Sequence, residues 1–352
     1  GCSLQHLSYE GQLVFKQNNV AQLIKRIGKV DDAEVLPTIG MAEPWHYRNK
    51  VQFPVRDVRG EIKIGYYAKR SHRIVETEIC YIQDRRNEEI KTMLFDWMTA
   101  SGVTAYDEQK HRGQVRHLVT RVSHASGKMH VTIVINARRL RHVDSFVEQL
   151  SKCDYISGIA LSINRDETNV IMGTELVHLY GEDFLEDSIG EVKFHISPQS
   201  FYQINPIQTE KLYAKVLDYA DLTGNETVLD IFCGIGSISL FLAQKAKKII
   251  GVEIVSEAIE NAKHNAKLNG ISNTEFYVGK AEDVVPMLYE QKGITADVVV
   301  VDPPRKGCDE KLLETIVQMG PKKLVYVSCD PGTLARDIAY LTAVSYTHLR
   351  AH

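Results

Sequence analysis

The last part of the chain, after Asn205, alternates short apolar runs with helical segments, and this rhythm constrains the fold most strongly. Five runs rich in Val and Ile follow one another: TVLDIF, KIIGVEI, EFYVG, DVVVVD and KLVYVSC. Runs that are apolar on both faces are typical of strands buried in a parallel sheet. Their alternation with helices predicts a doubly wound, Rossmann-like α/β domain. In that architecture ligands bind at the carboxyl ends of the strands.

Residues from about 37 to 204 have a different pattern of apolar and turn residues, which predicts a mixed α+β domain rich in strands. NKVQFPVRDVRGEIKIGYY reads as two strands around a turn near Asp57 to Gly60, and VRHLVTRVSHASGKMHVTIVI reads as a second hairpin. Apolar residues at helical spacing predict a helix over residues 9–27. Further strands are expected at residues 159–164, 168–172 and 191–196.

Composition excludes several classes of protein. With 44% hydrophobic and 25% charged residues, the chain is typical of a soluble globular protein. It contains neither a run long enough to span a membrane nor a secretion signal. Six scattered cysteines without paired spacing favour a reducing, cytoplasmic location over a disulfide framework.

Charge is unevenly distributed along the chain. Residues 41–145 carry 19 Lys and Arg against 12 Asp and Glu, although the whole chain has a formal net charge of −3. A basic segment beside an acidic one suits a protein in which one part holds phosphates and the other does chemistry. The alternative is an ordinary scatter of surface charge.

Both ends of the chain look unusual. It opens at Gly1-Cys2 without an initiating Met and closes on SYTHLRAH, which resembles translated sequencing-adaptor sequence. Residues 345–352 are therefore expected to be a non-native tail and are excluded from fold reasoning.

The first apolar run ends in DIFCGIGS, and the second ends in Glu253. Gly234 and Gly236 allow a tight turn and a close approach to a ligand. Glu253, 19 residues after Gly234, can accept hydrogen bonds from two ribose hydroxyls. Each feature alone has a simpler explanation, a tight turn or an exposed acid, but together they indicate a nucleoside-bearing cofactor. Ser239 replaces the third glycine of the dinucleotide pattern, which favours S-adenosylmethionine over NAD.

The fourth and fifth runs end in DPPRKG and YVSCDPGT, which place Asp302 and Cys329 at the mouth of the same pocket. Carbon 5 of uracil is too poor a nucleophile to attack a sulfonium methyl group. A thiolate that adds to carbon 6 turns the ring into an enolate, and carbon 5 of the enolate can attack the methyl group. A base must then remove the carbon-5 proton. A cysteine in a core strand is usually only a small apolar filler, so this role depends on Cys329 reaching the pocket.

Cys233 and Cys308 are competing thiols. Cys233 lies in the glycine loop, where it is expected to pack beneath the cofactor. RNA cytosine-5 methyltransferases usually carry a cysteine directly after the proline of this motif, where the present chain has Arg305. That difference favours uridine over cytidine as the target.

DPPRKG, followed after 16 residues by LVYVSCDPGT, resembles the main pattern of the RNA uracil-5-methyltransferase family. SPQSFYQIN and VRHLVTR resemble two further stretches of that family. The resemblance covers the chain up to about Leu341. It implies methyl transfer from S-adenosylmethionine to carbon 5 of a uridine in RNA, giving 5-methyluridine, with Cys329 as the nucleophile. The implied cofactor contacts are Gln203, Phe232, Gly234, Glu253 and Asp302.

The same resemblance implies that residues 5–36 pack with residues 205–344 as one methyltransferase domain, separated in sequence by the domain at 37–204. The chain also departs from the family pattern in one respect. The family's general base is a glutamate in a His-x-Glu pattern close to the C-terminus, and none follows Cys329 here. The chain is therefore expected to form an adduct with RNA but to release product poorly.

GCSLQHLSYE resembles the end of an iron–sulfur pattern found in the rRNA-methylating branch of the family. Cys2 would match its last cysteine, and Cys80 the distant fourth ligand of a 4Fe–4S cluster. With two of four ligands present, this chain is not expected to hold the cluster, which is assigned to a longer parent protein. This remnant favours 23S rRNA over tRNA as the substrate.

Three basic segments, at residues 68–73, 111–121 and 137–142, favour an RNA-binding surface on the β-rich domain. RNA is the expected partner, whereas membranes and DNA are not. Three alternatives remain open: a tRNA uridine-5 methyltransferase, an RNA cytosine-5 methyltransferase, and a non-catalytic RNA-binding protein on an inherited scaffold.

Overall fold

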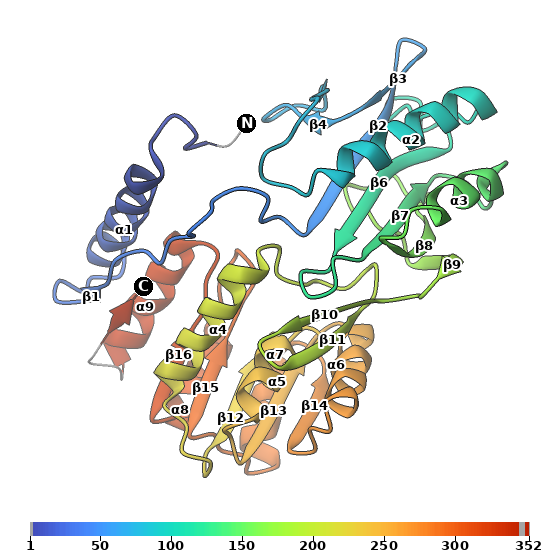
Figure 1. The fold of residues 1–352 in the computed structure, drawn as a ribbon. Coiled ribbons are helices and arrows are strands. Elements are labelled where there is room, and N and C mark those ends of the chain that lie inside the picture. Colours follow the sequence, from blue (N-terminus) through green and yellow to red (C-terminus); the bar gives the residue numbers. More distant parts are fainter. Residues whose placement is uncertain (1–2, 345–348, 352) are drawn as a thin grey trace. The chain divides into compact units, whose positions relative to one another are not determined.

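The structure is a computed structural model that describes residues 3–344 and 349–351. The chain forms two compact units (Figure 1). One is Glu43–Ile207, and the other combines residues 3–42 with the described residues from Gln208 onward. The sequence predicts boundaries at residues 37 and 204, six and three residues before those of the unit Glu43–Ile207.

The first unit is built on a six-stranded sheet with the order β3-β2-β6-β7-β8-β9. Neighbouring strands are antiparallel except β7 and β8, which are parallel because helix α3 connects them. The elements are β2 (Lys50–Val58), β3 (Glu61–Ile64), β4 (Tyr66–Tyr67), β5 (Ile74–Val75), α2 (Arg86–Ser101), β6 (Val115–Val122), β7 (Met129–Ile135), α3 (Val143–Ser151), β8 (Ile156–Ile163), β9 (Glu175–Gly181), β10 (Leu185–Ile189) and β11 (Val192–Ile196).

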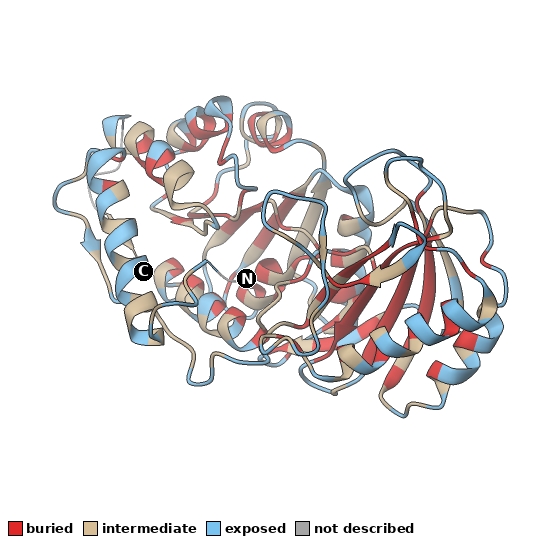
Figure 2. Cartoon of the chain, turned by 90° about the horizontal axis from the view of Figure 1, so that it is seen from above, coloured by how far each residue is buried: buried red, intermediate tan, exposed pale blue. Residues whose placement is uncertain are grey.

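Strands β6 and β7 are buried along their whole length (Figure 2). Helices α2 and α3 supply the apolar side chains that pack on one face of the sheet, with Trp97 stacked on Phe146. The opposite face carries polar side chains. Among them is Arg121, which donates a hydrogen bond to the carbonyl of Ser200 at 2.6 Å. The sheet therefore has an apolar core on one side and a buried polar layer on the other.

The strand expected at residues 168–172 is wrong, since the structure has bends there and the strand begins at Glu175. Side chains satisfy the carbonyls of this loop in place of a neighbouring strand. Arg116 donates to the carbonyls of Asp166 and Thr168, and Asn164 donates to those of Val170 and Ile171. Apolar letters alone do not reveal such partners.

The second unit contains a five-stranded parallel sheet with the order β14-β13-β12-β15-β16. This is the doubly wound α/β sheet expected from the five apolar runs. Its elements are α4 (Pro206–Ala220), β12 (Thr227–Ile231), α5 (Ser237–Ala243), β13 (Lys248–Glu253), α6 (Ser256–Leu268), β14 (Thr274–Val278), α7 (Ala281–Pro286), the π-helix η1 (Met287–Gln291), β15 (Val298–Val301), α8 (Glu310–Met319), β16 (Lys323–Tyr326) and α9 (Pro331–Val344).

The strand order reverses beside β12, whose neighbours are β13 and β15. This topological switch point is where open α/β sheets bind ligands, at the carboxyl ends of the strands. Helices α7, α8 and α9 contribute side chains to one core with β12, β13 and β15. Val298–Val301 is buried throughout, as a central parallel strand requires.

The N-terminal segment completes the second unit. Helix α1 (Tyr9–Arg26) contacts α9, and β1 (Glu34–Val35) pairs in parallel with β17 (Arg350–Ala351). Of the tail set aside from the sequence, Arg350 and Ala351 thus belong to a small sheet, and residues 345–348 and 352 lie outside the described residues. Among the helices of the described residues, none has both the length and the apolar character needed to cross a membrane.

Candidate active site

The loop after β12 forms one wall of the candidate site. Phe232, Gly234 and Gly236 have left-handed backbones, with φ of 67°, 56° and 80°. A Cβ at Gly236 would lie 3.1 Å from the Cβ of Ala262 in α6, so close packing requires glycine there. A Cβ at Gly234 would meet nothing within 4 Å. The backbone at Gly234 therefore faces open space, in which a ligand can approach it.

Glu253 ends β13 and is bound to this loop. One carboxylate oxygen accepts a hydrogen bond from the backbone N–H of Gly234 at 3.2 Å, and the other accepts one from Val255 at 2.9 Å. Each oxygen retains acceptor capacity. The carboxylate is thus held in a fixed orientation, in which it can still accept hydrogen bonds from ribose hydroxyls.

Two further carboxyl groups lie near this loop. Asp230 is fully buried in β12, where the hydroxyl of Ser239 donates to it. Burial raises the pKa of Asp230 to about 7, and the charges of Asp302 and Glu253 add to that effect. Burial also raises the pKa of Asp302 to about 6. The surroundings are acidic, and they suit a ligand that carries positive charge, as a sulfonium does.

Backbone hydrogen bonds place the ends of three strands side by side. The N–H of Asp302 donates to the carbonyl of Ile231 at 3.3 Å, next to Phe232. The N–H of Val327 donates to the carbonyl of Val301 at 2.8 Å. Cys329 follows two residues later. The structure therefore brings the loops that carry Phe232, Asp302 and Cys329 to adjacent strand ends.

Cys329 precedes the first turn of α9 and is exposed. The carboxylate of Asp330 caps that turn, because it accepts hydrogen bonds from the N–H groups of Gly332 at 2.9 Å and Thr333 at 3.2 Å. Ser328 accepts from the N–H of Asp330 at 3.1 Å. The backbone on the helical side of Cys329 is thereby fixed, while its thiol stays open to solvent.

The DPPRKG loop is bound to α9 by a buried carboxylate. Asp337 is 1% exposed and accepts hydrogen bonds from the N–H of Cys308 at 2.8 Å and the hydroxyl of Tyr326 at 2.6 Å. Arg336 pairs with Asp337 at 2.6 Å and also donates to the carbonyl of Lys306 at 2.9 Å. The loop after Asp302 and the helix after Cys329 are therefore held as one assembly.

The two competing cysteines are less suited to nucleophilic attack. Burial raises the pKa of Cys233 well above its usual value, and it raises the pKa of Cys308 to about 12. Both thiols stay protonated at neutral pH and are shielded from solvent. Of the cysteines in the described part of the chain, Cys329 is the exposed one.

Other predicted site residues lie elsewhere. Gln203 belongs to the first unit, where its carbonyl accepts a hydrogen bond from Asn49 at 2.9 Å; its cofactor contact stays a prediction. Cys80 is half-buried, also in the first unit, and Cys2 lies outside the described residues. Within residues 3–344 and 349–351, no group of three or more His, Cys, Asp or Glu is arranged to hold a metal ion.

One basic segment expected on the RNA-binding surface is largely internal. Arg116, His117 and Arg121 of β6 are 3–5% exposed. Their strand is covered on both faces, so of this segment the exposed cationic residues are His111 and Arg112. The expectation that the whole segment faces RNA is corrected accordingly.

Sequence reasoning missed Asp230 and Asp337. Asp230 had a signal, because it is a charged residue in the middle of TVLDIF, a run that was expected to be a buried strand. A charge there needs a partner or a raised pKa. Asp337 had no comparable signal, since its donors come from a loop and a strand that only the fold brings together.

Comparisons with known proteins identify the family of this chain. The model of the tRNA (uracil-5-)-methyltransferase family matches residues 8–350. Proteins from Clostridium acetobutylicum and Listeria monocytogenes, each described as an uncharacterized RNA methyltransferase, are 50% and 51% identical; the matches cover 98% of this chain and 76% of each relative.

Among solved structures, the chain is similar to the Pyrococcus abyssi tRNA (uracil-54, C5)-methyltransferase in complex with S-adenosyl-L-homocysteine. The TM-score is 0.79 and the identity 26%, over 97% of this chain and 79% of that one. The open space at Gly234, the oriented Glu253 and the acidic surroundings fit an S-adenosyl cofactor. The chain therefore belongs to the tRNA (uracil-5-)-methyltransferase family and is an S-adenosylmethionine-dependent RNA methyltransferase.

Proposed function

We propose that the protein methylates carbon 5 of a uridine in RNA through a covalent adduct between Cys329 and carbon 6 of the uracil. The observation that carries this proposal is the exposed thiol of Cys329 on a loop adjacent to the loops of Asp302 and Phe232. A second supporting observation is the protonated, buried state of Cys233 and Cys308.

In this mechanism, the Cys329 thiolate forms a bond to carbon 6, and the electron pair of the 5,6 double bond moves onto carbon 5 and the adjoining carbonyl. Carbon 5 takes the methyl group from the sulfonium of S-adenosylmethionine, which leaves as the thioether. A base then removes the proton from carbon 5, and the sulfur departs as the double bond re-forms. The target base must leave its stack to reach the thiol.

Four residues of the second unit are assigned to the methyl donor. Glu253 accepts hydrogen bonds from the ribose hydroxyls, and Gly234 leaves room for the nucleoside. Phe232 shapes the turn at the end of β12, and Asp302 supplies negative charge near the sulfonium. Gln203 of the first unit is assigned to the donor by family resemblance.

For the RNA itself, we propose 23S rRNA, on the resemblance of the N-terminal residues and Cys80 to an iron–sulfur pattern. The second candidate is tRNA, which the similar Pyrococcus abyssi enzyme and the name of the family favour. Methylation assays on both RNAs, with a methyl-labelled donor and mapping of the modified nucleotide, separate the two candidates.

Trapping with 5-fluorouridine tests the covalent step. Fluorine at carbon 5 cannot leave as a proton, so the adduct should persist through denaturing electrophoresis. We expect peptide mass spectrometry to place the RNA on the peptide that contains Cys329. An adduct on Cys308, or trapping only by 5-fluorocytidine RNA, would contradict the proposal and favour a cytosine-5 enzyme.

Affinity for S-adenosylmethionine is expected to depend on pH through Asp302. Its raised pKa of about 6 means that the carboxyl is ionised above that pH and neutral below it. Because the ionised form attracts the sulfonium, the affinity for S-adenosylmethionine should reach its maximum above about pH 7. Near pH 5 it should be about tenfold weaker than this maximum. Isothermal titration calorimetry across this range measures the change.

Asp302→Asn and S-adenosylhomocysteine provide the controls for this prediction. The variant should bind the donor weakly at every pH in the range. S-adenosylhomocysteine lacks the sulfonium charge, so its affinity for the wild-type protein should change little. A pH dependence that persists unchanged in Asp302→Asn would exclude Asp302 as its source.

A further inference from the structure

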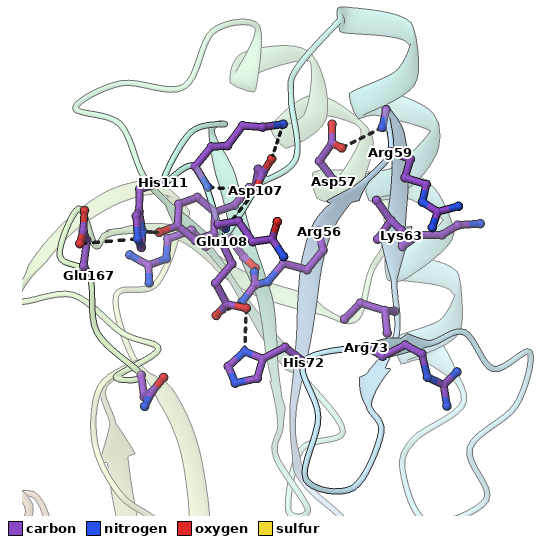
Figure 3. Close-up of a pocket in the computed structure, with 18 of the residues that line it drawn as sticks. Arg56, Asp57, Arg59, Lys63, His72, Arg73, Asp107, Glu108, His111 and Glu167 are labelled. Carbon is purple, nitrogen blue, oxygen red and sulfur yellow. Dashed lines mark hydrogen bonds and ion pairs between the residues drawn. The ribbon is translucent and has the colours of Figure 1, made fainter.

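A cavity of about 1240 Å³ lies wholly within the first unit (Figure 3). Four segments line it: the β2–β3 hairpin, the loop that leads into β5, the loop before β6, and the loop after β8. Pockets for single small molecules usually measure about 300–1,000 Å³. The size of the cavity suits a stretch of polymer better than one small molecule.

Two buried arginines line this cavity. Arg56 and Arg116 are 5% and 3% exposed, and their guanidinium groups lie over the ring of Tyr106 at 5.4 and 4.6 Å. Within the described residues, Arg116 bonds only to neutral oxygens and Arg56 has one carboxylate partner, Glu108, at 3.5 Å. Glu108 is shared with His72, at 2.7 Å. Among the residues that the structure describes, Glu108 is thus the one carboxylate paired with either of these two buried arginines.

A neighbouring histidine is affected by this positive charge. His117 is buried, and burial together with the charges of Arg56 and Arg116 lowers its pKa to about 3. It is neutral at physiological pH and does not add to the charge. The local field thus disfavours cations and favours anions.

At the rim of the cavity, most charges are paired. Lys63 pairs with Glu76 at 3.0 Å, and Lys110 pairs with Asp107 at 3.0 Å. Arg59 and Arg73 differ, because both are exposed and neither has a carboxylate partner in the described part of the chain. In Figure 3 both guanidinium groups lie on the side of the cavity that is formed by the β2–β3 hairpin and the loop leading into β5.

The backbone at Arg59 gives an independent reason to assign it a role. Arg59 and Gly60 have φ of 58° and 88°, which is the two-residue hairpin turn that favours Asn-Gly. An arginine in the left-handed region is strained, and asparagine would fit the turn better. Strain of this kind is typically retained where the side chain serves a function.

We propose that this cavity binds phosphate groups of the substrate RNA backbone, with Arg59 and Arg73 as direct ligands and Arg56 and Arg116 as the source of a positive field beneath them. Guanidinium groups bind phosphate oxygens through paired hydrogen bonds. The site rests on the proposed function, since its ligand is the RNA that the enzyme methylates. It holds RNA through a surface that takes no part in the methyl transfer.

The test compares two double variants of the full chain. Arg59→Asn with Arg73→Ala removes two cavity arginines, and Arg85→Ala with Lys152→Ala removes two exposed cations of the same unit that lie outside the cavity and outside the three basic segments. Binding of fluorescein-labelled oligouridylate is measured by anisotropy over a series of salt concentrations. The cavity variant should bind about tenfold more weakly, and its salt slope should fall by about 1.4, or about 0.7 for each lost phosphate contact.

Thermal unfolding separates this role from a structural one. The single variant Arg59→Asn should raise the melting temperature, because it relieves the turn, and should still weaken RNA binding. Equal losses of RNA affinity in the two double variants, or unchanged RNA affinity in the cavity variant, would overturn the proposal. Binding of inorganic phosphate at the cavity without any effect on RNA would also overturn it. If the wild-type protein binds RNA here but methylates no uridine, the proposed function fails and the cavity proposal stands.

Discussion

Replacing Cys329 with alanine is expected to abolish methyl transfer to RNA, with a fall of at least about a thousandfold in the single-turnover rate. The physical reason is that carbon 5 of uracil is too weak a nucleophile to attack the sulfonium methyl group until sulfur adds to carbon 6. Because the side chain is exposed, the substitution should leave the melting temperature and the affinity for S-adenosylmethionine unchanged. Transfer of label from the donor to RNA, counted after digestion of the protein, measures the effect.

Cys308→Ala is the matched control for this experiment. Cys308 is buried beside Asp337 and Tyr326, so its replacement should lower stability while methyl transfer persists. Transfer by Cys329→Ala within tenfold of wild type would exclude a covalent role for that sulfur. Loss of transfer together with loss of donor binding would indicate a folding defect in place of a chemical one.

Replacing Asp337 with asparagine is expected to lower the free energy of unfolding by about 3 kcal/mol. The buried carboxylate accepts hydrogen bonds from Cys308 and Tyr326 on one oxygen and from Arg336 on the other. An amide places N–H donors against one of these sets of donors and leaves them unsatisfied. Urea denaturation of the wild-type and variant proteins measures the difference.

The same substitution should also slow methyl transfer, since Asp337 holds the loop after Asp302 against the helix that follows Cys329. Asp283→Asn is a suitable control, because Asp283 is exposed and pairs with Lys311 at 3.7 Å. Exposed pairs contribute at most about 1 kcal/mol. A change below about 1 kcal/mol in Asp337→Asn would show that the carboxylate is not what fixes the loop.

The fold class was accessible from the sequence because central parallel strands are buried on both faces. Val298–Val301 illustrates this, since four consecutive Val residues cannot alternate between core and solvent. The family was accessible for a similar reason, because motifs at strand ends have fixed residues at fixed spacing. The roles of individual site residues stay predictions that the experiments above address.

Elements whose partners are distant in the sequence were not accessible. Residues 168–172 look like a strand in isolation, yet Arg116 and Asn164 bind their carbonyls. Likewise, the basic residues of β6 suggested an RNA-binding surface, although the strand is buried along its whole length. In both cases the deciding contact comes from outside the local segment, where periodicity carries no information.

The contact between α1 and α9 has a consequence for the order of events during synthesis. Helix α1 leaves the ribosome before the β-rich unit, whereas α9 leaves it after that unit. The β-rich unit between them has all of its strands once Ile196 has emerged, so it can acquire its structure while the remainder is still being translated. Helix α1 therefore makes its contact with α9 only after the β-rich unit has emerged, and the side of α1 that makes this contact is open to solvent in the interval.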